Sequence, residues 1–291
     1  MKSVALTFDL DFTDYLNEEI LQDEFEQCWP IFTNICQKMP QLKSTWFIRI
    51  DEQMGELYGA PDYIFSKHGE KINWLLEREH EIGWHFHSYR KSGEKWVQNS
   101  NENDVVNEMK KMQPYVQKYN LSIARMGWAY HTNQTVKTMA ESGIIVDCSP
   151  MPRPNYKWDN ALRDWSLTKN GPYYPSKTDY RVSGETAWPM LFIPFTMLPI
   201  KAEYDTEEGV LRYLNPCYHK SVFQMVIDSC EEQNINIVAH PYEFLANKNK
   251  HKMLAFDASV FEENLEYMAN QKFNFNTISQ FVEKVKNQNT K

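Results

Sequence analysis

Pairs of ionisable side chains end two of the apolar, strand-like segments of this chain. Asp9 and Asp11 end the first such segment, and His85 and His87 end the third. Residues two apart on a strand point to the same face, so each pair can present both of its groups together. Two imidazoles and one carboxylate form an open ligand set that suits Zn²⁺, and also Fe²⁺, Mn²⁺ or Co²⁺. The spacing therefore predicts a site for one divalent metal ion.

Three further strand-like segments also end in a polar side chain. These endings are Arg125, Asp147 and His240. In a (β/α) barrel the reactive groups lie at the carboxyl ends of the strands, so five such endings together indicate one site. Taken singly, an aspartate can equally stabilise the turn after a strand. The other five histidines show no comparable pairing, and we expect them to be structural or surface residues: His68, His80, His131, His219 and His251.

Short β-rich segments alternate with helical patterns and would position these residues. Strands are predicted at Ser3–Phe8, Ser44–Ile50, Glu81–His87, Leu121–Arg125, Ile144–Asp147, Met190–Phe195, Ile235–His240 and Phe273–Thr277. Helices are predicted at Glu18–Met39, Pro61–Glu79, Glu102–Tyr119, Asn133–Ser142, Pro216–Gln233 and Ser259–Asn270, with a last helix to Lys286.

This alternation predicts an α/β fold, an irregular or incomplete (β/α) barrel with about seven parallel strands. We expect one domain over residues 1–291, with an insertion at about residues 150–189. A doubly wound open sheet is the alternative. No glycine-rich phosphate loop follows any strand, which disfavours a nucleotide-binding version of that sheet.

Composition and charge exclude several classes of protein. Hydrophobic residues make up 42% of the 291 residues and aromatic residues 14%, enough for a packed core. A formal net charge of -8 argues against a general binder of nucleic acid or of anionic membranes. No apolar segment approaches the roughly 18 residues of a membrane span. The N-terminal sequence has no signal-peptide pattern, so we expect a cytoplasmic protein.

The cysteines agree with a reducing compartment. The five cysteines are odd in number and widely spaced, with no CxxC pair: Cys28, Cys36, Cys148, Cys217 and Cys230. Cys28 and Cys36 lie eight apart in a helical pattern, and we expect buried free thiols there.

Four segments together resemble the polysaccharide deacetylases of the NodB-homology type, carbohydrate esterase family four. Thr7–Asp11 (TFDLD) resembles the family's TFDDG motif, and His80–His87 (HEIGWHFH) resembles HEIGNHTxxH. The stretch from Arg125 to Ile144 resembles RxPxGxxNxxTxxxxxxxGI, and Val238–Tyr242 (VAHPY) resembles the histidine motif that follows an apolar strand. The matches fall in the family's order and cover roughly residues 4–245.

Three positions depart from the family's pattern. Leu10 separates two acids that are adjacent in most members. Tyr89 stands where the second histidine usually lies, and His87 is its natural substitute, which leaves open which of the two completes the site. Gly127 stands at the proline of RxP. With these departures, the chain resembles a divergent branch of the family that has D-x-D and H-x-H motifs and is associated with surface-glycan biosynthesis.

The resemblance implies a metal-dependent hydrolase of amide bonds, which removes an N-acyl group, first of all N-acetyl, from a sugar or sugar conjugate. Asp11, His85 and His87 would bind the metal, with zinc as the first expectation and Fe, Mn, Co or Ni as alternatives. Such an ion lowers the pKa of its bound water towards about 7 and polarises the acyl oxygen.

The same resemblance assigns roles to four other residues. Asp9 would be the general base, and Arg125 would pair with it and keep it ionised. His240 would protonate the leaving amine, and Asp147 would orient His240.

Aromatic side chains near these motifs are candidates for a sugar-binding wall, because they combine stacking area with a polar tip. They are Trp84, Trp128, Tyr130, Tyr173, Tyr174 and Tyr242. Core packing is the alternative for each of them. Residues 150–189 hold six of the 14 prolines, and we expect this segment to cover the strand ends. A structural belt on the outer side of the barrel is the other interpretation.

Two other functions stay open. One is a metal-independent hydrolase of cyclic amides, as in allantoinase-like members of the superfamily, and metal content would separate it from the first hypothesis. The other is a glycan-binding relative without turnover, which Tyr89 suggests and which the retained Asp9, Arg125 and His240 disfavour. The sequence predicts no nucleic-acid partner and gives no oligomeric state.

Overall fold

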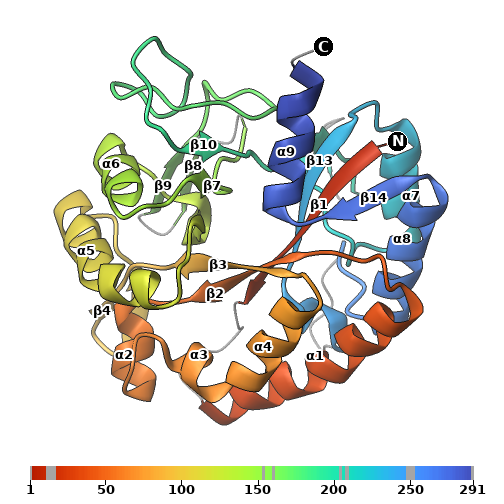
Figure 1. Cartoon of the computed structure of the whole chain (residues 1–291), viewed down its shortest axis with the longest axis horizontal. Coiled ribbons are helices and arrows are strands. Elements are labelled where there is room, and N and C mark those ends of the chain that lie inside the picture. The colour runs from red at the N-terminus through yellow and green to blue at the C-terminus, as the bar shows by residue number, and fades with distance from the viewer. Residues whose placement is uncertain are drawn as a thin grey trace. The chain divides into compact units, whose positions relative to one another are not determined.

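The structure is a computed structural model (Figure 1), which describes residues 2–10, 18–152, 155–158, 161–202, 205–206, 210–246 and 253–289. The contacts among its residues divide the chain into two compact units. Unit 1 comprises Met1–Trp46, Arg78–Glu81 and Thr196–Lys291, and unit 2 comprises Phe47–Glu77 and Ile82–Phe195.

Unit 1 is built on the strand β1 (Lys2–Leu10), which pairs in parallel with both β13 (Asn234–Ala239) and β14 (Phe273–Asn276). Phe8 of β1 lies opposite Ala239, the last residue of β13, and β1 continues two residues further to Leu10. The ring of Phe8 packs against four other aromatic rings, those of Phe32, Trp46, Phe244 and Phe261. The carboxyl ends of β1 and β13 therefore rest on an aromatic core.

The other elements of unit 1 are helices and one short antiparallel pair. The helices are α1 (Glu18–Lys38), α7 (Lys220–Ser229), the 3-10 turn η2 (Pro241–Phe244), α8 (Ala258–Asn270) and α9 (Ile278–Asn289). The antiparallel strands are β11 (Met197–Pro199) and β12 (Leu211–Tyr213).

Unit 2 contains the parallel strands β6 (Ile123–Met126), β7 (Val146–Asp147) and β10 (Leu191–Phe192), with β3 (Glu81–Phe86), which enters the unit at Ile82. Its helices are α2 (Glu52–Tyr58), α3 (Tyr63–Lys67), α4 (Gly69–Glu77), α5 (Glu102–Lys118), the 3-10 turn η1 (Gly127–Ala129) and α6 (Asn133–Glu141).

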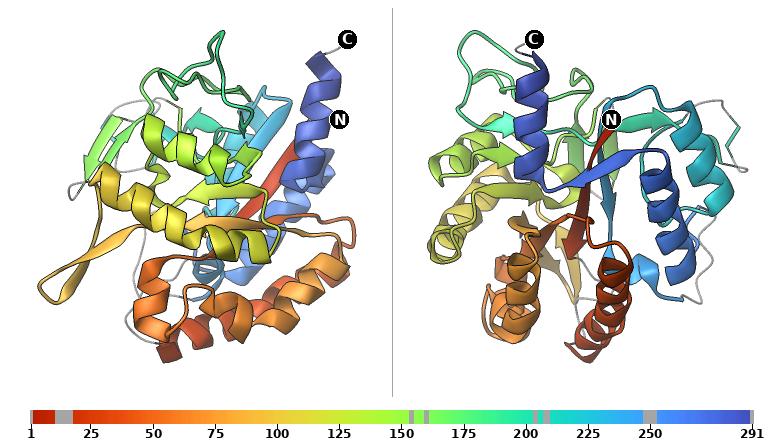
Figure 2. Two further views of the ribbon diagram at one scale, coloured as in Figure 1. Left: turned by 60° about the vertical axis from the view of Figure 1, so that its left-hand side comes forward. Right: turned by 45° about the vertical axis from the view of Figure 1, so that its right-hand side comes forward.

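Two hairpins complete unit 2. The first joins β4 (Tyr89–Ser92) to β5 (Lys95–Gln98), and Figure 2 shows it extending outward from the unit. The second joins β8 (Asn155–Trp158) to β9 (Ala161–Asp164). Both hairpins begin shortly after a parallel strand ends, so they belong to the connections at the carboxyl ends of β3 and β7.

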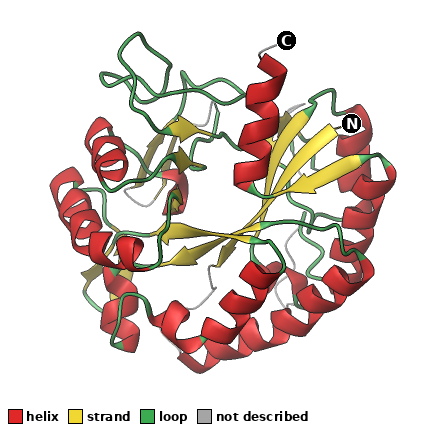
Figure 3. Ribbon diagram, viewed as in Figure 1, coloured by secondary structure: helices red, strands yellow, loops and turns green. Residues whose placement is uncertain are grey.

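The strand order confirms the predicted fold class. The hydrogen-bonded order of the main sheet is β10-β7-β6-β3-β2-β1-β13, with β14 also paired to β1, where β2 is Thr45–Arg49. Helices separate most of these strands along the chain (Figure 3), the repetition that defines a (β/α) barrel. The order ends at β10 on one side and at β13 on the other. The chain therefore has the expected α/β fold of an incomplete (β/α) barrel.

Local differences from the prediction have simple causes. The helix expected over Pro61–Glu79 is divided into α3 and α4, with the break at His68 before Gly69, a residue that weakens helices. The polar segment after β3 forms the hairpin β4–β5, and a second hairpin lies within residues 150–189. Helix α2 was not predicted. All five cysteines are free thiols; Cys28 is buried as expected, whereas Cys36 is only partly buried. Among the described residues, no helix is long and apolar enough to cross a bilayer.

The close packing of β3 gives a test of the fold. A Cβ on Gly83 would lie 2.7 Å from Cδ1 of Phe47 and 2.9 Å from Cγ1 of Ile123, two buried side chains. We expect Gly83→Ala to lower the free energy of unfolding by about 1–3 kcal/mol, as overpacking typically does. The measurement is urea denaturation. Gly69→Ala is the control, because no atom lies within 4 Å of a Cβ there. Equal denaturation midpoints for both variants and the unaltered protein would contradict the packing described.

Candidate active site

Two imidazole rings meet at the carboxyl end of β3. Nε2 of His87 lies 3.1 Å from Nε2 of His85, and the ring planes are 89° apart. On its other side, His85 donates from Nδ1 to the backbone oxygen of Arg125 over 2.9 Å. A carbonyl oxygen can only accept, so Nδ1 carries the hydrogen, and the lone pair of neutral His85 is on Nε2, which faces His87. The exposed fractions of His85 and His87 are 2% and 3%, so both rings are held in a buried site.

This pair fits a divalent metal ion. Zinc lies about 2.0–2.1 Å from imidazole nitrogen, so two nitrogens on one ion are about 2.8–3.4 Å apart at angles between square and tetrahedral. The backbone carbonyl behind His85 is a usual second partner of a metal-binding histidine. The third predicted ligand, Asp11, lies outside the described residues. The described residues contain no complete group of three His, Cys, Asp or Glu ligands.

Tyr89 and Trp128 surround His87. The rings of His87 and Tyr89 are stacked, with centroids 5.2 Å apart and planes 12° apart, and the Trp128 ring meets His87 at 84°. The indole N–H of Trp128 donates to the Tyr89 hydroxyl over 3.2 Å. Tyr89, at the family's usual histidine position, is therefore a neighbour that packs on His87, and its hydroxyl accepts a bond from Trp128.

Arg125 is a buried cation fixed by aromatic rings. Its register partner on β3 is His85, its Nε donates to the backbone oxygen of Cys148 over 3.1 Å, and its exposed fraction is 1%. The guanidinium carbon lies 4.3 Å and 4.6 Å from the centroids of Phe47 and Phe195. Such cation–π contacts hold the charge in place without neutralising it. The predicted pairing of Arg125 with Asp9 joins residues of the two units and stays a prediction.

Asp147 has a partner that the sequence did not indicate. Its Oδ2 lies 2.8 Å from Nε2 of His131, and its Oδ1 accepts from the backbone N–H of Ser149 over 2.6 Å. Both side chains of the Asp147–His131 pair are fully buried. His131, expected to be structural or surface, is thus the buried partner of a predicted site residue. Nothing in the spacing of these two residues indicated the contact, which depends on the parallel pairing of β6 with β7.

In unit 1, the predicted base lies near the end of β1 and the predicted acid directly follows β13. Asp9 and His240 come directly after the register pair Phe8 and Ala239, and Asp9 is buried. Nδ1 of His240 lies 3.3 Å from Oε1 of Glu243. Oε2 of Glu243 accepts from the backbone N–H of His240 over 2.9 Å and from Nδ2 of Asn215 over 2.8 Å. The carboxylate observed at His240 is therefore Glu243, while the carboxylate predicted there, Asp147, bonds His131.

Sequence reasoning missed Glu243, although a signal was present. His240-Pro241-Tyr242-Glu243 has the spacing of a helix-start motif in which the fourth residue bonds back to the first. The turn η2 places this carboxylate on both the backbone and the ring of His240.

The predicted sugar-binding aromatics differ in their environment. Trp84 is fully buried and donates from its indole N–H to the backbone oxygen of Ile50 over 2.9 Å, which favours core packing. The Tyr130 hydroxyl donates to the backbone oxygen of Ser100 over 3.4 Å. Tyr242 stacks on His240, with ring centroids 5.4 Å apart. Tyr173 is half-buried, and Tyr174 is 42% exposed.

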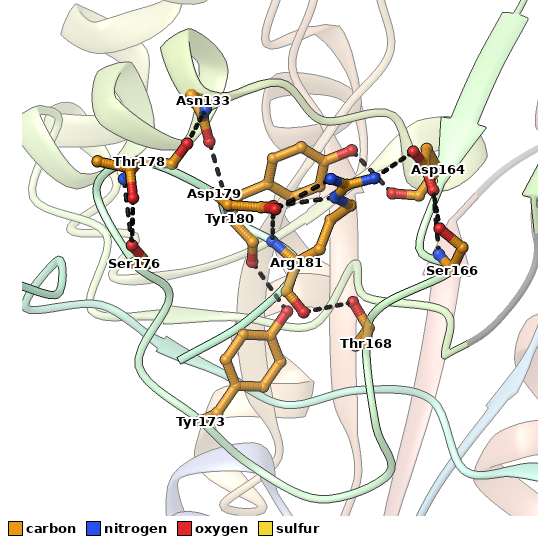
Figure 4. A network of polar contacts seen from close by, with 10 residues as sticks. All are labelled: Asn133, Asp164, Ser166, Thr168, Tyr173, Ser176, Thr178, Asp179, Tyr180 and Arg181. Atoms are coloured by element: carbon orange, nitrogen blue, oxygen red, sulfur yellow. Dashed lines mark hydrogen bonds and ion pairs between the residues drawn. The ribbon is translucent and has the colours of Figure 1, made fainter. Parts of the chain in front are cut away.

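The described part of residues 150–189 is ordered by its own polar network (Figure 4). Arg181 pairs with Asp164 and with Asp179, and Tyr173 donates to the backbone oxygen of Tyr180 over 3.0 Å. Three bonds tie this segment to the connection after β6, one of them from Nδ2 of Asn133 to the backbone oxygen of Thr178 over 2.7 Å. Trp165 donates to the backbone oxygen of Ala129 over 2.9 Å, and Asn133 accepts from the backbone N–H of Tyr180 over 2.9 Å. Part of the segment thus lies at the carboxyl end of β6, as the covering role requires.

Comparisons with known proteins concern the fold. No family model and no curated protein matches the chain. A protein of Mycobacterium smegmatis assigned to the polysaccharide deacetylases is similar in structure, with a TM-score of 0.57 and 16% identity over 99% of this chain and 91% of that one. The chain has a polysaccharide deacetylase fold.

A second similar structure has a different reaction in its name. The 4-alpha-glucanotransferase of Thermococcus litoralis matches with a TM-score of 0.54 and 12% identity, over 98% of this chain and 41% of that one. A family 4 carbohydrate esterase from Streptomyces lividans matches with a TM-score of 0.41 and 9% identity over 95% of this chain and 93% of that one, too weakly to carry an argument. The deacetylase fold therefore does not by itself determine the reaction.

A buried carboxyl group next to the histidine pair gives a pH prediction. Ser88, the residue after His87, donates to Oε2 of Glu108, and the backbone N–H of Glu52 donates to Oε1. Burial raises the pKa of Glu108 to about 8, and the nearby Asp51 charge also raises it. An unfolded carboxyl titrates near 4.5, so between these values the folded protein holds one more proton than the unfolded chain. Glu108 therefore lowers stability as pH rises from about 4.5 to about 8.

We expect Glu108→Gln to remove the fall in the free energy of unfolding that Glu108 causes as pH rises. Relative to the unaltered protein, its free energy of unfolding should rise across the same pH window by a few kcal/mol, on the order that such a pKa difference implies. Urea denaturation at pH 5 and pH 8.5 measures the difference. The exposed Glu185→Gln is the control and should leave the profile unchanged. Parallel profiles for Glu108→Gln and the unaltered protein would show that Glu108 is ionised throughout.

Proposed function

We propose that this protein is a metal-dependent deacetylase that removes an N-acyl group, first of all N-acetyl, from a sugar or sugar conjugate. The observation that carries the proposal is the pair of facing Nε2 atoms of His85 and His87, with His85 oriented by the Arg125 carbonyl. The pair lies at the carboxyl end of a strand, where this class of fold carries its reactive groups. The fold shared with an assigned polysaccharide deacetylase supports the reaction class.

In this proposal Asp11, His85 and His87 hold the ion, with zinc as the first candidate. When bound, such an ion supplies a polarising charge for the acyl oxygen and an acidified water. The tautomer of His85 suits metal binding, because its Nδ1–H donates to the backbone oxygen of Arg125 and its lone pair is on Nε2. Carboxylate and imidazole donors also accept Fe, Mn, Co or Ni.

Asp9 acts as the general base in the proposed mechanism. It takes a proton from the attacking water as the new C–O bond forms at the acyl carbon. A buried carboxylate stays ionised only if a positive charge or hydrogen bonds favour that form, and Arg125 is the proposed positive charge. The rings of Phe47 and Phe195 fix the guanidinium of Arg125.

His240 acts as the general acid. As the C–N bond breaks, Nε2 of His240 gives its proton to the sugar nitrogen, and the products are a free amine and a carboxylate such as acetate. Glu243 supports this step because its carboxylate lies 3.3 Å from Nδ1 of His240 and favours the protonated ring. We therefore assign the orienting role, expected of Asp147, to Glu243.

The proposed substrate is a carbohydrate, which aromatic side chains recognise by stacking. Trp128 packs on His87 and Tyr242 stacks on His240. The segment that carries Tyr173 and Tyr174 is tied through Trp165 to the connection after β6, and Tyr130 is a further candidate for the sugar-binding wall. A role in cytoplasmic assembly of a surface glycan is part of the proposal and rests on the H-x-H and D-x-D motifs.

Metal removal is the first test of the proposal. We expect a chelator to abolish release of acetate from N-acetylated sugars and Zn²⁺ or Co²⁺ to restore it. His85→Ala and His87→Ala should each lose more than about 100-fold in metal affinity, because loss of a mere supporting partner already costs about 10–100-fold. Calorimetric titration with Zn²⁺ and an acetate assay provide the measurements. Full release of acetate after complete metal removal would contradict the metal dependence. Opening of a cyclic amide by the metal-free protein would favour the cyclic-amide alternative, and redistribution of glucan length without acetate would favour glycosyl transfer.

The second test separates the base from the acid. We expect Asp9→Asn to lower deacetylation by about 10²–10⁴-fold, the usual contribution of a general base, with metal content retained. His240→Ala is the matched comparison. It should lose hydrolysis of the amide but keep most hydrolysis of an activated acetyl ester, whose leaving group needs no proton, whereas Asp9→Asn should lose both. Turnover by Asp9→Asn within a few-fold of the unaltered protein would remove Asp9 from the mechanism.

A further inference from the structure

Gly127 faces the ring of His87. Register pairs His85 with Arg125 and Phe86 with Met126, so the next residues along the two strands are His87 and Gly127. A Cβ on Gly127 would lie 2.3 Å from Cε1 and Nδ1 of His87 and 2.4 Å from Cδ2. The φ angle of Gly127 is outside the left-handed region. Glycine is therefore required here for space, and any side chain would displace the His87 ring.

Two aromatic rings restrain His87 further. Tyr89 stacks on its face, Trp128 meets it nearly at a right angle, and the Trp128 N–H donates to the Tyr89 hydroxyl. The Arg49 guanidinium carbon lies 5.5 Å from the Tyr89 centroid, and Arg49 is itself bonded to Asp51 over 2.7 Å. Tyr89 and Trp128 are thus joined to each other, and Tyr89 is joined to a buried ion pair.

The backbone after Gly127 is strained. Trp128 and Ala129 have φ angles of 57° and 51°, a left-handed conformation that costs non-glycine residues roughly 1–2 kcal/mol each. Strain of this kind persists where the surrounding structure imposes it, and it clusters at functional sites. Here it turns the chain directly after Gly127 and brings the Trp128 ring back to His87.

We propose that Tyr89, Gly127 and Trp128 form a clamp that sets the ring of His87 against His85 and so makes His87 the second imidazole ligand. All three are positioning residues. The inference rests on the proposed function, because it takes His87 as a ligand. It links two departures from the family's motifs, since tyrosine at 89 supplies the stacking ring and glycine at 127 leaves room for His87.

The test is Gly127→Ala, with a readout that needs no metal. The ring signals of His87, identified by their loss in His87→Ala, should move in the ¹H–¹⁵N spectrum of metal-free Gly127→Ala. Zn²⁺ affinity, measured by calorimetry, should fall at least about 10-fold, as when a supporting partner is lost. Gly184→Ala is the control, because its Cβ would also be crowded, 2.8 Å from Cβ of Ser176, in a contact that does not involve His87. It should leave both readouts unchanged.

A double-mutant cycle decides whether Gly127 acts through His87. In the His87→Ala background, Gly127→Ala should cause no further loss of Zn²⁺ affinity. Unchanged His87 signals in Gly127→Ala, or an equal loss of affinity in both backgrounds, would overturn the clamp. If Gly127→Ala does not fold, Tyr89→Leu removes the stacking ring without adding bulk, and the His87 signals must again move. A wild-type protein that binds no Zn²⁺ would contradict the proposed function, whereas the ring signals would still decide the clamp.

Discussion

The register of β3 against β6 is the constraint on which the candidate site depends. It sets His85 opposite Arg125, which supplies the carbonyl that fixes the tautomer of His85. It also sets His87 next to Gly127, where the missing side chain leaves space for the ring. Side chains alternate along a strand, so a slip of one residue would turn both imidazoles to the other face. The Gly83 backbone, packed against Phe47 and Ile123, helps to hold this register.

Buried ionisable side chains are the second recurring feature, and a different set of contacts stabilises each of them. Arg125 lies between aromatic rings, Asp147 bonds His131 and a backbone N–H, and Glu243 accepts from Asn215 and from the backbone of His240. Removing one partner of a buried pair costs far more than the pair contributes, so such groups are held rigidly. Rigid placement is what acid–base chemistry needs, because a misplaced proton donor loses much of its effect.

The sequence was informative where periodicity and strand ends carry the signal. Short apolar segments rich in β-branched and aromatic residues located the parallel strands, and polar endings located His85, His87 and Arg125. The sequence alone did not predict contacts between residues that are far apart along the chain. Asp147 bonds His131, a contact that the sequence did not indicate because it depends on the pairing of β6 with β7 rather than on spacing within one segment. Glu243 was missed because its spacing is equally that of an ordinary helix start. Asp11 lies outside the described residues, and its role stays a prediction.

The most direct test of the account is anomalous diffraction at the zinc edge from crystals of the zinc-loaded protein. The account predicts one zinc ion bound by Nε2 of His85, Nε2 of His87 and a carboxylate oxygen of Asp11. A fully active protein whose crystals show no anomalous peak at this pair, with the two imidazoles bonded only to each other, would contradict it.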